Sequence, residues 1–313
     1  MSKRLLYTFF ILLAAIIWGF AFVVQSTGIA DVGPFLFSGA RMLVACVILI
    51  PLYLVTEHRK RRDEPLSEEQ QREERQRFWL AAGVGGSFGV LTTIGNAMQL
   101  TALLHMTAGK NAFLVCMYVA IVPFILLAVG QKSTWLVWLG VVLAVIGMFL
   151  LCIKGDSLAF AWADWLAIGS AVFAAVIIAI TDKVVNRVNA LVLVLGECVV
   201  CGVLSTVVGI FRESIAWEDL LAAGPEILYL GILGTALAFT LQAVGQREVD
   251  PAVTSILISL ESVFAVIFGF LFLHEMLTGR ELLGCAFVFA ATIISNLPQA
   301  APKEAVPKEA AAE

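Results

Sequence analysis

Ten apolar runs, each long enough to cross a lipid bilayer, make up most of the sequence. A helix rises about 1.5 Å per residue, so roughly 20 apolar residues span the hydrocarbon core. The runs are continuous rather than alternating, which favours membrane helices over the strands of a membrane barrel. They lie near residues 5–26, 34–55, 78–100, 108–130, 134–154, 163–182, 188–211, 222–245, 251–273 and 280–297. The sequence therefore predicts an all-α membrane protein with ten transmembrane helices.

Composition and motifs exclude most other classes of protein. Hydrophobic residues make up 60% and charged residues 14% of the chain, against about half and a quarter in soluble domains. The six cysteines lie in apolar runs and the three histidines are far apart, so we expect no metal site and no cofactor. Cys198 and Cys201 have the spacing of a redox motif, but inside an apolar run they are typical of small packing residues. The sequence contains neither a phosphate-binding loop nor a hydrolase motif, so we expect no enzyme and no ATP-driven pump.

The placement of the charges predicts the orientation of the chain. If the N-terminus is cytoplasmic, the cytoplasmic segments hold 15 Lys and Arg residues and the opposite segments hold four. Because cytoplasmic loops are enriched in Lys and Arg, we expect both termini in the cytoplasm. Residues 5–24 follow a basic start like a signal peptide, but they are long enough to be the first membrane helix. We expect the charged loop 56–77 to be a short solvated helix or disordered, and the tail 298–313 to be disordered.

A weak internal repeat divides the chain into two halves. Shifting residues 107–150 by 144 positions onto 251–294 aligns 8 identical residues of 44, with similar punctuation by small and polar residues. Helices four and five then correspond to nine and ten, which predicts one five-helix repeat in 1–155 and a second in 156–297. Because five is an odd number, tandem copies cross the membrane in opposite senses. Such inverted repeats are typical of secondary transporters, whose substrate site lies where the halves meet.

Several short motifs carry a family resemblance. The chain has WGFAF at 18–22, an early helix-two arginine at Arg41, GTALAF at 234–239 and LES at 260–262. In this order they resemble the drug/metabolite transporter (DMT) superfamily, in its EamA-like ten-helix branch. The likeness covers nearly the whole chain apart from the loop 56–77 and the tail. Two positions depart from the family pattern: Ser262 stands where a proline commonly follows the glutamate, and Gln131 stands at an acidic position of the first half.

The resemblance implies a function. Such a protein is expected to be a secondary-active exporter of small organic metabolites, such as amino acids, in the inner cell membrane. It is expected to work by alternating access around a cavity lined by helices one to four and six to nine. Protons are the candidate coupling ion, a monomer is favoured, and no nucleic-acid partner is expected. Two alternatives stay open: an uncoupled facilitator of the same solutes, or a membrane scaffold or receptor that transports nothing.

Charged residues inside the bilayer are costly and often functional, which singles out Arg41, Glu197 and Glu261. Arg41 is expected to capture a substrate carboxylate, to form a structural ion pair with Glu197, or to extend outward along its stem. Glu197 and Glu261 are the candidates for proton coupling, because a carboxyl group away from water can exchange a proton near neutral pH. A structural, hydrogen-bonded glutamate is the alternative.

Neutral polar and aromatic residues complete the predicted substrate site. In membrane helices such residues can orient a solute, but they also join neighbouring helices. Lys110, near the start of the fourth run, is expected to reach the lipid headgroups rather than the cavity mouth. The further substrate-binding candidates are Trp18, Asn96, Gln99, Asn111, Tyr118 and Gln242.

Overall fold

The computed structural model describes residues 3–63, 67–131, 133–152, 161–214, 217–273 and 278–297. All regular elements in these ranges are helices. They are α1 (Lys3–Val32), α2 (Pro34–Asp63), α3 (Glu68–Leu103), α4 (Ala108–Val115), α5 (Tyr118–Ala128), α6 (Trp135–Cys152), α7 (Trp162–Val184), α8 (Ala190–Arg212), α9 (Trp217–Ala222), α10 (Gly224–Tyr229), the π-helix η1 (Leu230–Leu237), α11 (Ala238–Gly245), α12 (Pro251–Ile258), α13 (Leu260–Leu273) and α14 (Gly279–Asn296).

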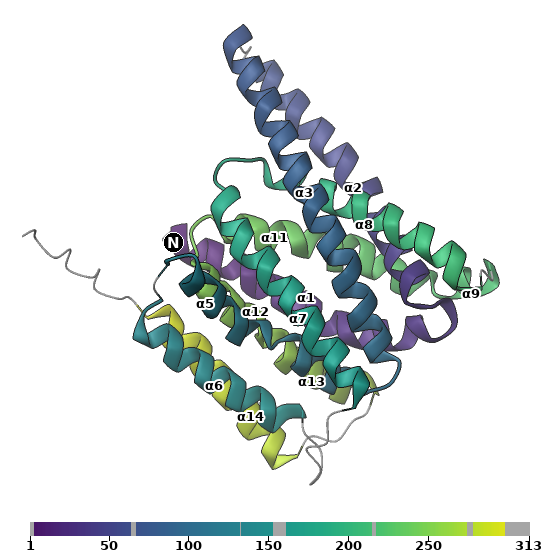
Figure 1. Ribbon diagram of the computed structural model, residues 1–313, viewed down its shortest axis with the longest axis vertical. Helices are drawn as coiled ribbons and strands as arrows, with labels where there is room; N and C mark the ends of the chain where they lie inside the picture. The colour runs from purple at the N-terminus through teal and green to yellow at the C-terminus, as the bar shows by residue number, and fades with distance from the viewer. Residues whose placement is uncertain are drawn as a thin grey trace, which may run out of the picture.

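The lengths of these helices suit a membrane. Within the described ranges, eight helical segments are long and apolar enough to span a bilayer. Two shorter apolar helices, α6 and α14, pack against each other along one edge of the bundle (Figure 1). Large apolar side chains are exposed on the outside, for example Val47 at 68% and Phe211 at 83%. An apolar exterior of this extent fits lipid rather than water, so a multi-pass helical membrane protein is confirmed.

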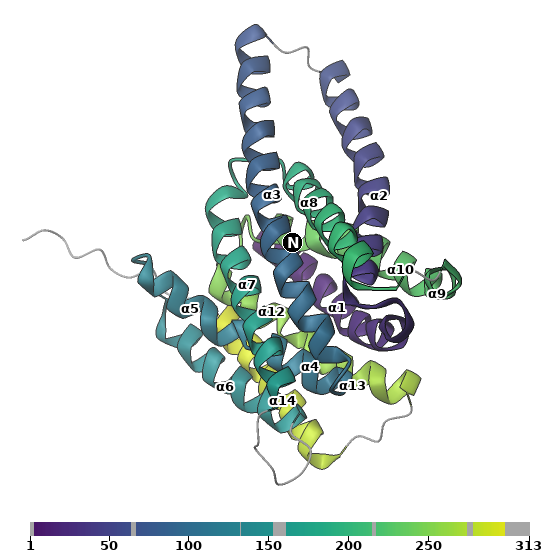
Figure 2. The same ribbon diagram turned by 45° about the vertical axis from the view of Figure 1, so that its right-hand side comes forward.

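The charged loop 56–77 is mostly helical. Helices α2 and α3 continue past their apolar parts and project beyond the rest of the bundle (Figures 1 and 2). Ser67 caps α3, because its hydroxyl accepts from Gln70 N while its own N–H donates to Gln70 Oε1 at 2.9 Å. The loop is therefore a pair of helical extensions rather than one separate short helix. Residues 64–66, and the predicted disorder of the tail 298–313, lie outside the described residues.

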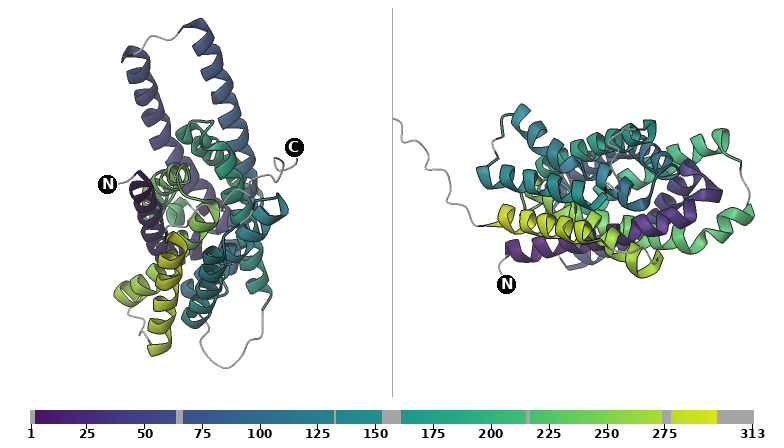
Figure 3. Two further views of the ribbon diagram at one scale, coloured as in Figure 1. Left: turned by 90° about the vertical axis from the view of Figure 1, so that its left-hand side faces the viewer. Right: turned by 90° about the horizontal axis from the view of Figure 1, so that it is seen from below.

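The two halves of the bundle are built alike. The 144-residue shift carries 135–152 onto 279–296, which are the bounds of α6 and α14. In the first half, α1 packs on α11 and α13 of the second half. In return, α7 packs on α3 and α5 of the first half. Each half therefore packs its first helix against helices of the other half. In Figure 3 the colours of the first and second halves of the chain are interleaved rather than set apart as separate lobes.

Two helices predicted as continuous are interrupted near their middles. The fourth run divides into α4 and α5 at Cys116 and Met117, and the ninth into α12 and α13 at Ser259. At both places a main-chain N–H donates to the carbonyl three residues earlier rather than four. An example is Val119 N, which donates to Cys116 O at 3.0 Å. In the ninth run the hydroxyl of Ser262 donates to Ser259 O at 2.7 Å. Serine hydroxyls that bond back to their own helix promote such bends.

Helix α3 approaches α8 closely through glycine. A Cβ added at Gly85 would collide with the main-chain oxygen of Leu193, and one at Gly89 would lie 2.7 Å from Glu197 O. Both contacts are with backbone, which cannot turn aside as a flexible side chain can. The spacing of these two glycines therefore sets the distance between α3 and α8 in one of the main contacts between the halves.

We expect Gly85→Ala to lower the stability of the folded protein by about 1–3 kcal/mol, because it overpacks a rigid contact. Gly83 lies two residues away on the same helix, and a Cβ there would meet nothing within 4 Å. Gly83→Ala should therefore be neutral, or stabilising by up to about 1 kcal/mol from helix propensity. Thermal unfolding of both variants in detergent checks this, and equal unfolding temperatures would contradict the close contact.

Candidate functional site

A cavity of about 190 Å³ lies between the two halves. Its walls come from α1, α2, α3, α4 and α5 on one side and from α7, α8, α11, α12 and α13 on the other. A cavity needs only about 10–15 Å³ to admit one water, so this one has room for several waters or for a small organic solute. Eight of the nine predicted site residues lie on its wall: Trp18, Arg41, Asn96, Gln99, Tyr118, Glu197, Gln242 and Glu261.

Arg41 reaches the cavity from α2. Only 6% of the residue is exposed, and its Nε is cut off from solvent without a hydrogen-bond partner. No hydrogen bond or ion pair joins its guanidinium to any residue within the described ranges. The Arg41–Glu197 ion pair considered from the sequence is therefore not formed. A buried guanidinium without a protein partner is costly, so this group is poised for a partner that enters the cavity.

Glu197 faces the same cavity from α8. The Thr92 hydroxyl on α3 donates to Glu197 Oε1 at 2.6 Å, so the carboxyl is held by a neutral donor instead of by Arg41. The residue is 5% exposed, but its second oxygen is not shut off from solvent. Sequence reasoning missed Thr92, because a threonine in an apolar run gives no signal until its neighbour on another helix is known.

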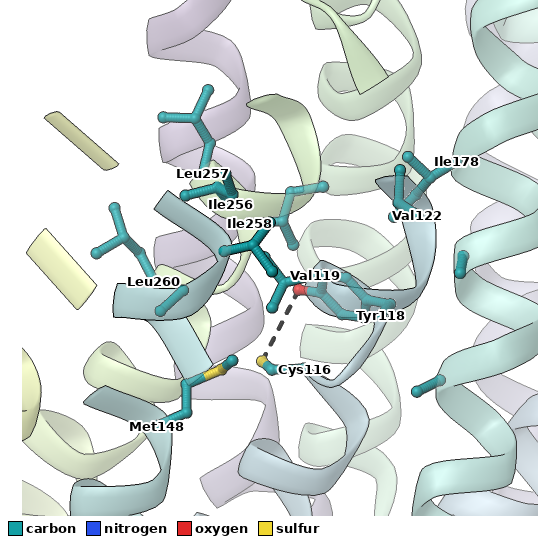
Figure 4. Packing of buried hydrophobic residues seen from close by; sticks show 14 of the residues in the cluster. Cys116, Tyr118, Val119, Val122, Met148, Ile178, Ile256, Leu257, Ile258 and Leu260 are labelled. Carbon is teal, nitrogen blue, oxygen red and sulfur yellow. Dashed lines mark hydrogen bonds between the residues drawn. The ribbon is translucent and has the colours of Figure 1, made fainter. Parts of the chain in front are cut away.

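Glu261 joins the two helix interruptions. Its Oε1 accepts from the Tyr118 hydroxyl at 2.8 Å and from Cys116 Sγ at 3.3 Å, across the gap between α13 and the α4–α5 break. Figure 4 shows Cys116 and Tyr118 pointing toward each other beside Ile258 and Leu260. On the other side of α13, a Cβ at Gly19 would lie 2.9 Å from Glu261 O, so α1 also packs tightly at this point.

The two sequence motifs around Trp18 and Gly234 meet in space. Trp18 Nε1 donates to Gly234 O at 2.7 Å, and the ring centroids of Trp18 and Phe239 lie 5.5 Å apart in an edge-to-face arrangement. Gly234 belongs to η1, a π-helix that the sequence did not predict. Segments of π-helix are rare and frequently occur at functional sites. Here the segment supports an aromatic wall of the cavity.

Three amides form a chain on the cavity side of α3. Gln99 Nε2 donates to Gln25 Oε1 at 3.1 Å and to Asn111 Oδ1 at 2.9 Å. Asn111 is fully buried behind the wall rather than on it, so it contacts the cavity through Gln99. Gln25 was not predicted, because it lies at the end of its apolar run and resembled a helix terminus.

The halves are also fastened at one end of the bundle by charge. Lys110 Nζ lies 2.7 Å from Asp164 Oδ1, so this lysine pairs with α7 instead of reaching toward the headgroups. Glu213, after α8, accepts from Phe35 N at 2.9 Å and from Leu36 N at 2.8 Å at the start of α2. A carboxylate at a helix N-terminus is stabilised by the free N–H groups there. Both contacts join the first half to the second.

Known proteins are similar to this chain in sequence and in fold. Over 304 residues the chain is 25% identical to an uncharacterized transporter of Archaeoglobus fulgidus, covering 94% of this chain and 87% of that protein. A stretch of 67 residues is 40% identical to Protein PecM of Dickeya dadantii, covering 21% of this chain and 23% of that protein. A crystal structure with 19% sequence identity has the same fold at a TM-score of 0.73, covering 94% of this chain and 98% of the other.

One family accounts for both halves. The sequence profile of the EamA-like transporter family matches residues 5–153 and again residues 161–297. Together the two matches contain every residue of the cavity wall. The chain therefore belongs to the EamA-like transporter family, as a membrane protein of two EamA repeats.

Proposed function

We propose that this protein exports small organic solutes, such as amino acids, from the cytoplasm by alternating access between its two halves. The observation that carries the proposal is Arg41, a buried cation that lines the cavity and has no partner within the described ranges. Such a group would bind the carboxylate of a solute through two parallel hydrogen bonds. Trp18, Asn96, Gln99, Tyr118 and Gln242 would complete the substrate site, with Asn111 supporting Gln99.

The proposed transporter has ten transmembrane helices in two inverted five-helix repeats. We propose that it lies in the inner cell membrane with both termini in the cytoplasm. The eight spans and the two shorter apolar helices support this arrangement, since they follow the ten apolar runs in order. The excess of Lys and Arg on one side supports the orientation. We propose that one chain acts as a monomer, because the cavity is built within a single chain.

Proton coupling is proposed to run through a carboxyl group of the cavity. Glu197 and Glu261 are both buried, and the second oxygen of each is not shut off from solvent. Glu261 is the stronger candidate, because its hydrogen bonds connect the two interrupted helices. A change in its protonation would alter those bonds at the place where the helices can bend most readily.

Flux through reconstituted vesicles tests the proposal. Vesicles containing the purified protein would be loaded with labelled amino acids, and efflux would be followed with and without an imposed proton gradient. Efflux accelerated by the gradient supports a coupled exporter. Efflux that ignores the gradient indicates the uncoupled facilitator. If no amino acid or other small organic acid moves, the transport function is wrong and a scaffold or receptor remains.

A further inference from the structure

The amide chain beside the cavity has a fixed hydrogen-bond direction. Asn111 Nδ2 donates to the main-chain oxygen of Gln99 at 3.1 Å. A main-chain carbonyl can only accept, so it determines which way the Asn111 amide points. Asn111 Oδ1 must then accept from Gln99 Nε2, whose second proton goes to Gln25 Oε1. One backbone carbonyl thus fixes the orientation of all three amides.

The fixed direction leaves two polar atoms without partners. Gln99 Oε1 and Gln25 Nε2 make no hydrogen bond to any residue in the described part of the chain. Both residues lie on the cavity wall and are more than nine-tenths buried, yet neither atom is shut off from solvent. The two bonded amides of the cavity wall therefore offer one free acceptor, Gln99 Oε1, and one free donor, Gln25 Nε2.

We propose that Gln25 and Gln99 select solutes carrying a neutral group that both donates and accepts, a carboxamide or a hydroxyl. A carboxylate offers no proton to Gln99 Oε1, an ammonium offers no acceptor to Gln25 Nε2, and an alkyl group offers neither. Asn111 is a positioning residue, since it acts on the solute only by holding Gln99. The inference rests on the proposed transport function and names the chemical group of the solute that Gln25 and Gln99 would recognise.

The energetic effect is one of discrimination. A solute without the matching group leaves a desolvated donor and acceptor unpaired, which costs roughly tenfold to a hundredfold in affinity. In an apolar pocket, the affinities for solute groups of equal shape differ far less. Selectivity between solutes of the same shape is therefore the measurement to make. It distinguishes solute recognition by Gln25 and Gln99 from a hydrogen bond that only joins two helices.

Asparagine, aspartate and leucine provide a matched set, because their side chains have nearly the same shape and differ in hydrogen-bonding chemistry. We expect the protein in vesicles to transport asparagine with a KM at least about tenfold below those of aspartate and leucine. Gln25→Glu keeps the acceptor for Gln99 but replaces the donor that faces the cavity, so the asparagine preference should fall toward unity. Asn111→Leu, which frees the Gln99 amide to turn, should have the same effect.

The readout is a ratio within one variant, so a partial loss of folded protein cancels. Ser255→Ala removes a buried hydroxyl that bonds to Ala252 O and lies off the cavity wall, and it should keep the preference for asparagine. Transport without a preference for asparagine overturns this inference but not the proposed function. So does a preference that survives both Gln25→Glu and Asn111→Leu. The absence of flux for all three amino acids and every other solute overturns the proposed function as well.

Discussion

Glu261→Gln is expected to remove the response of solute flux to an imposed proton gradient, while solute exchange continues without a gradient. The glutamine oxygen can still accept from Tyr118 and Cys116, so the contact between the interrupted helices is kept. The amide cannot bind and release a proton. A gradient of one pH unit supplies about 1.4 kcal/mol per proton, which is a tenfold accumulation of solute. We expect the variant to lose that tenfold accumulation in vesicles.

Glu197→Gln is the matched control, since it removes the other buried carboxyl of the same cavity. Its partner Thr92 can still donate to the glutamine oxygen. Glu197 lies in the uninterrupted helix α8, whereas Glu261 connects two helix breaks. We therefore expect Glu197→Gln to keep the response to the gradient. The assignment to Glu261 is wrong if the gradient still drives accumulation in Glu261→Gln.

The helical bundle could be predicted from the sequence because the signal is local. Lipid leaves the backbone no partner except itself, so a long apolar run has one main solution. The repeat was visible in the spacing of 107–150 and 251–294, and the bounds of α6 and α14 follow that spacing. The interruptions at Cys116 and Ser259 and the π-helix at 230–237 were not predicted. They depend on which main-chain carbonyls accept hydrogen bonds from neighbouring helices, and the sequence of an apolar run does not specify this.

The cavity residues were predictable as a set, because charges and amides are rare in apolar runs. Their partners were not. The sequence allows an ion pair between Arg41 and Glu197, yet rotation about each helix axis decides which side chains meet, and Glu197 bonds to Thr92 instead. Lys110 was assigned to the headgroups, but Asp164 lies within 2.7 Å. Pairing across helices is a property of packing, which one sequence does not specify at this resolution.

Arg41→Met is expected to make the folded protein more stable and inactive toward carboxylate solutes. Methionine has a similar length and no charge, so it removes a buried cation that has no partner in the described part of the chain. A buried ion carries a desolvation penalty of roughly several kcal/mol, and an apolar side chain of similar length removes that penalty. Thermal unfolding in detergent should therefore shift upward, while the saturable flux of carboxylate solutes disappears.

The two measurements together separate function from structure at this position. If Arg41 served the fold through an ion pair, Arg41→Met would leave an opposite charge unpaired and lower the unfolding temperature. Arg41→Lys is the second variant, because it keeps the charge but loses the planar pair of donors that matches a carboxylate. We expect it to retain part of the flux with a KM raised about tenfold or more, since a bidentate contact becomes a single one. A destabilised Arg41→Met with unchanged affinity for carboxylate solutes would contradict capture by this arginine. A stabilised, inactive variant would mean that the cost of burying Arg41 is offset only when a solute carboxylate occupies the cavity.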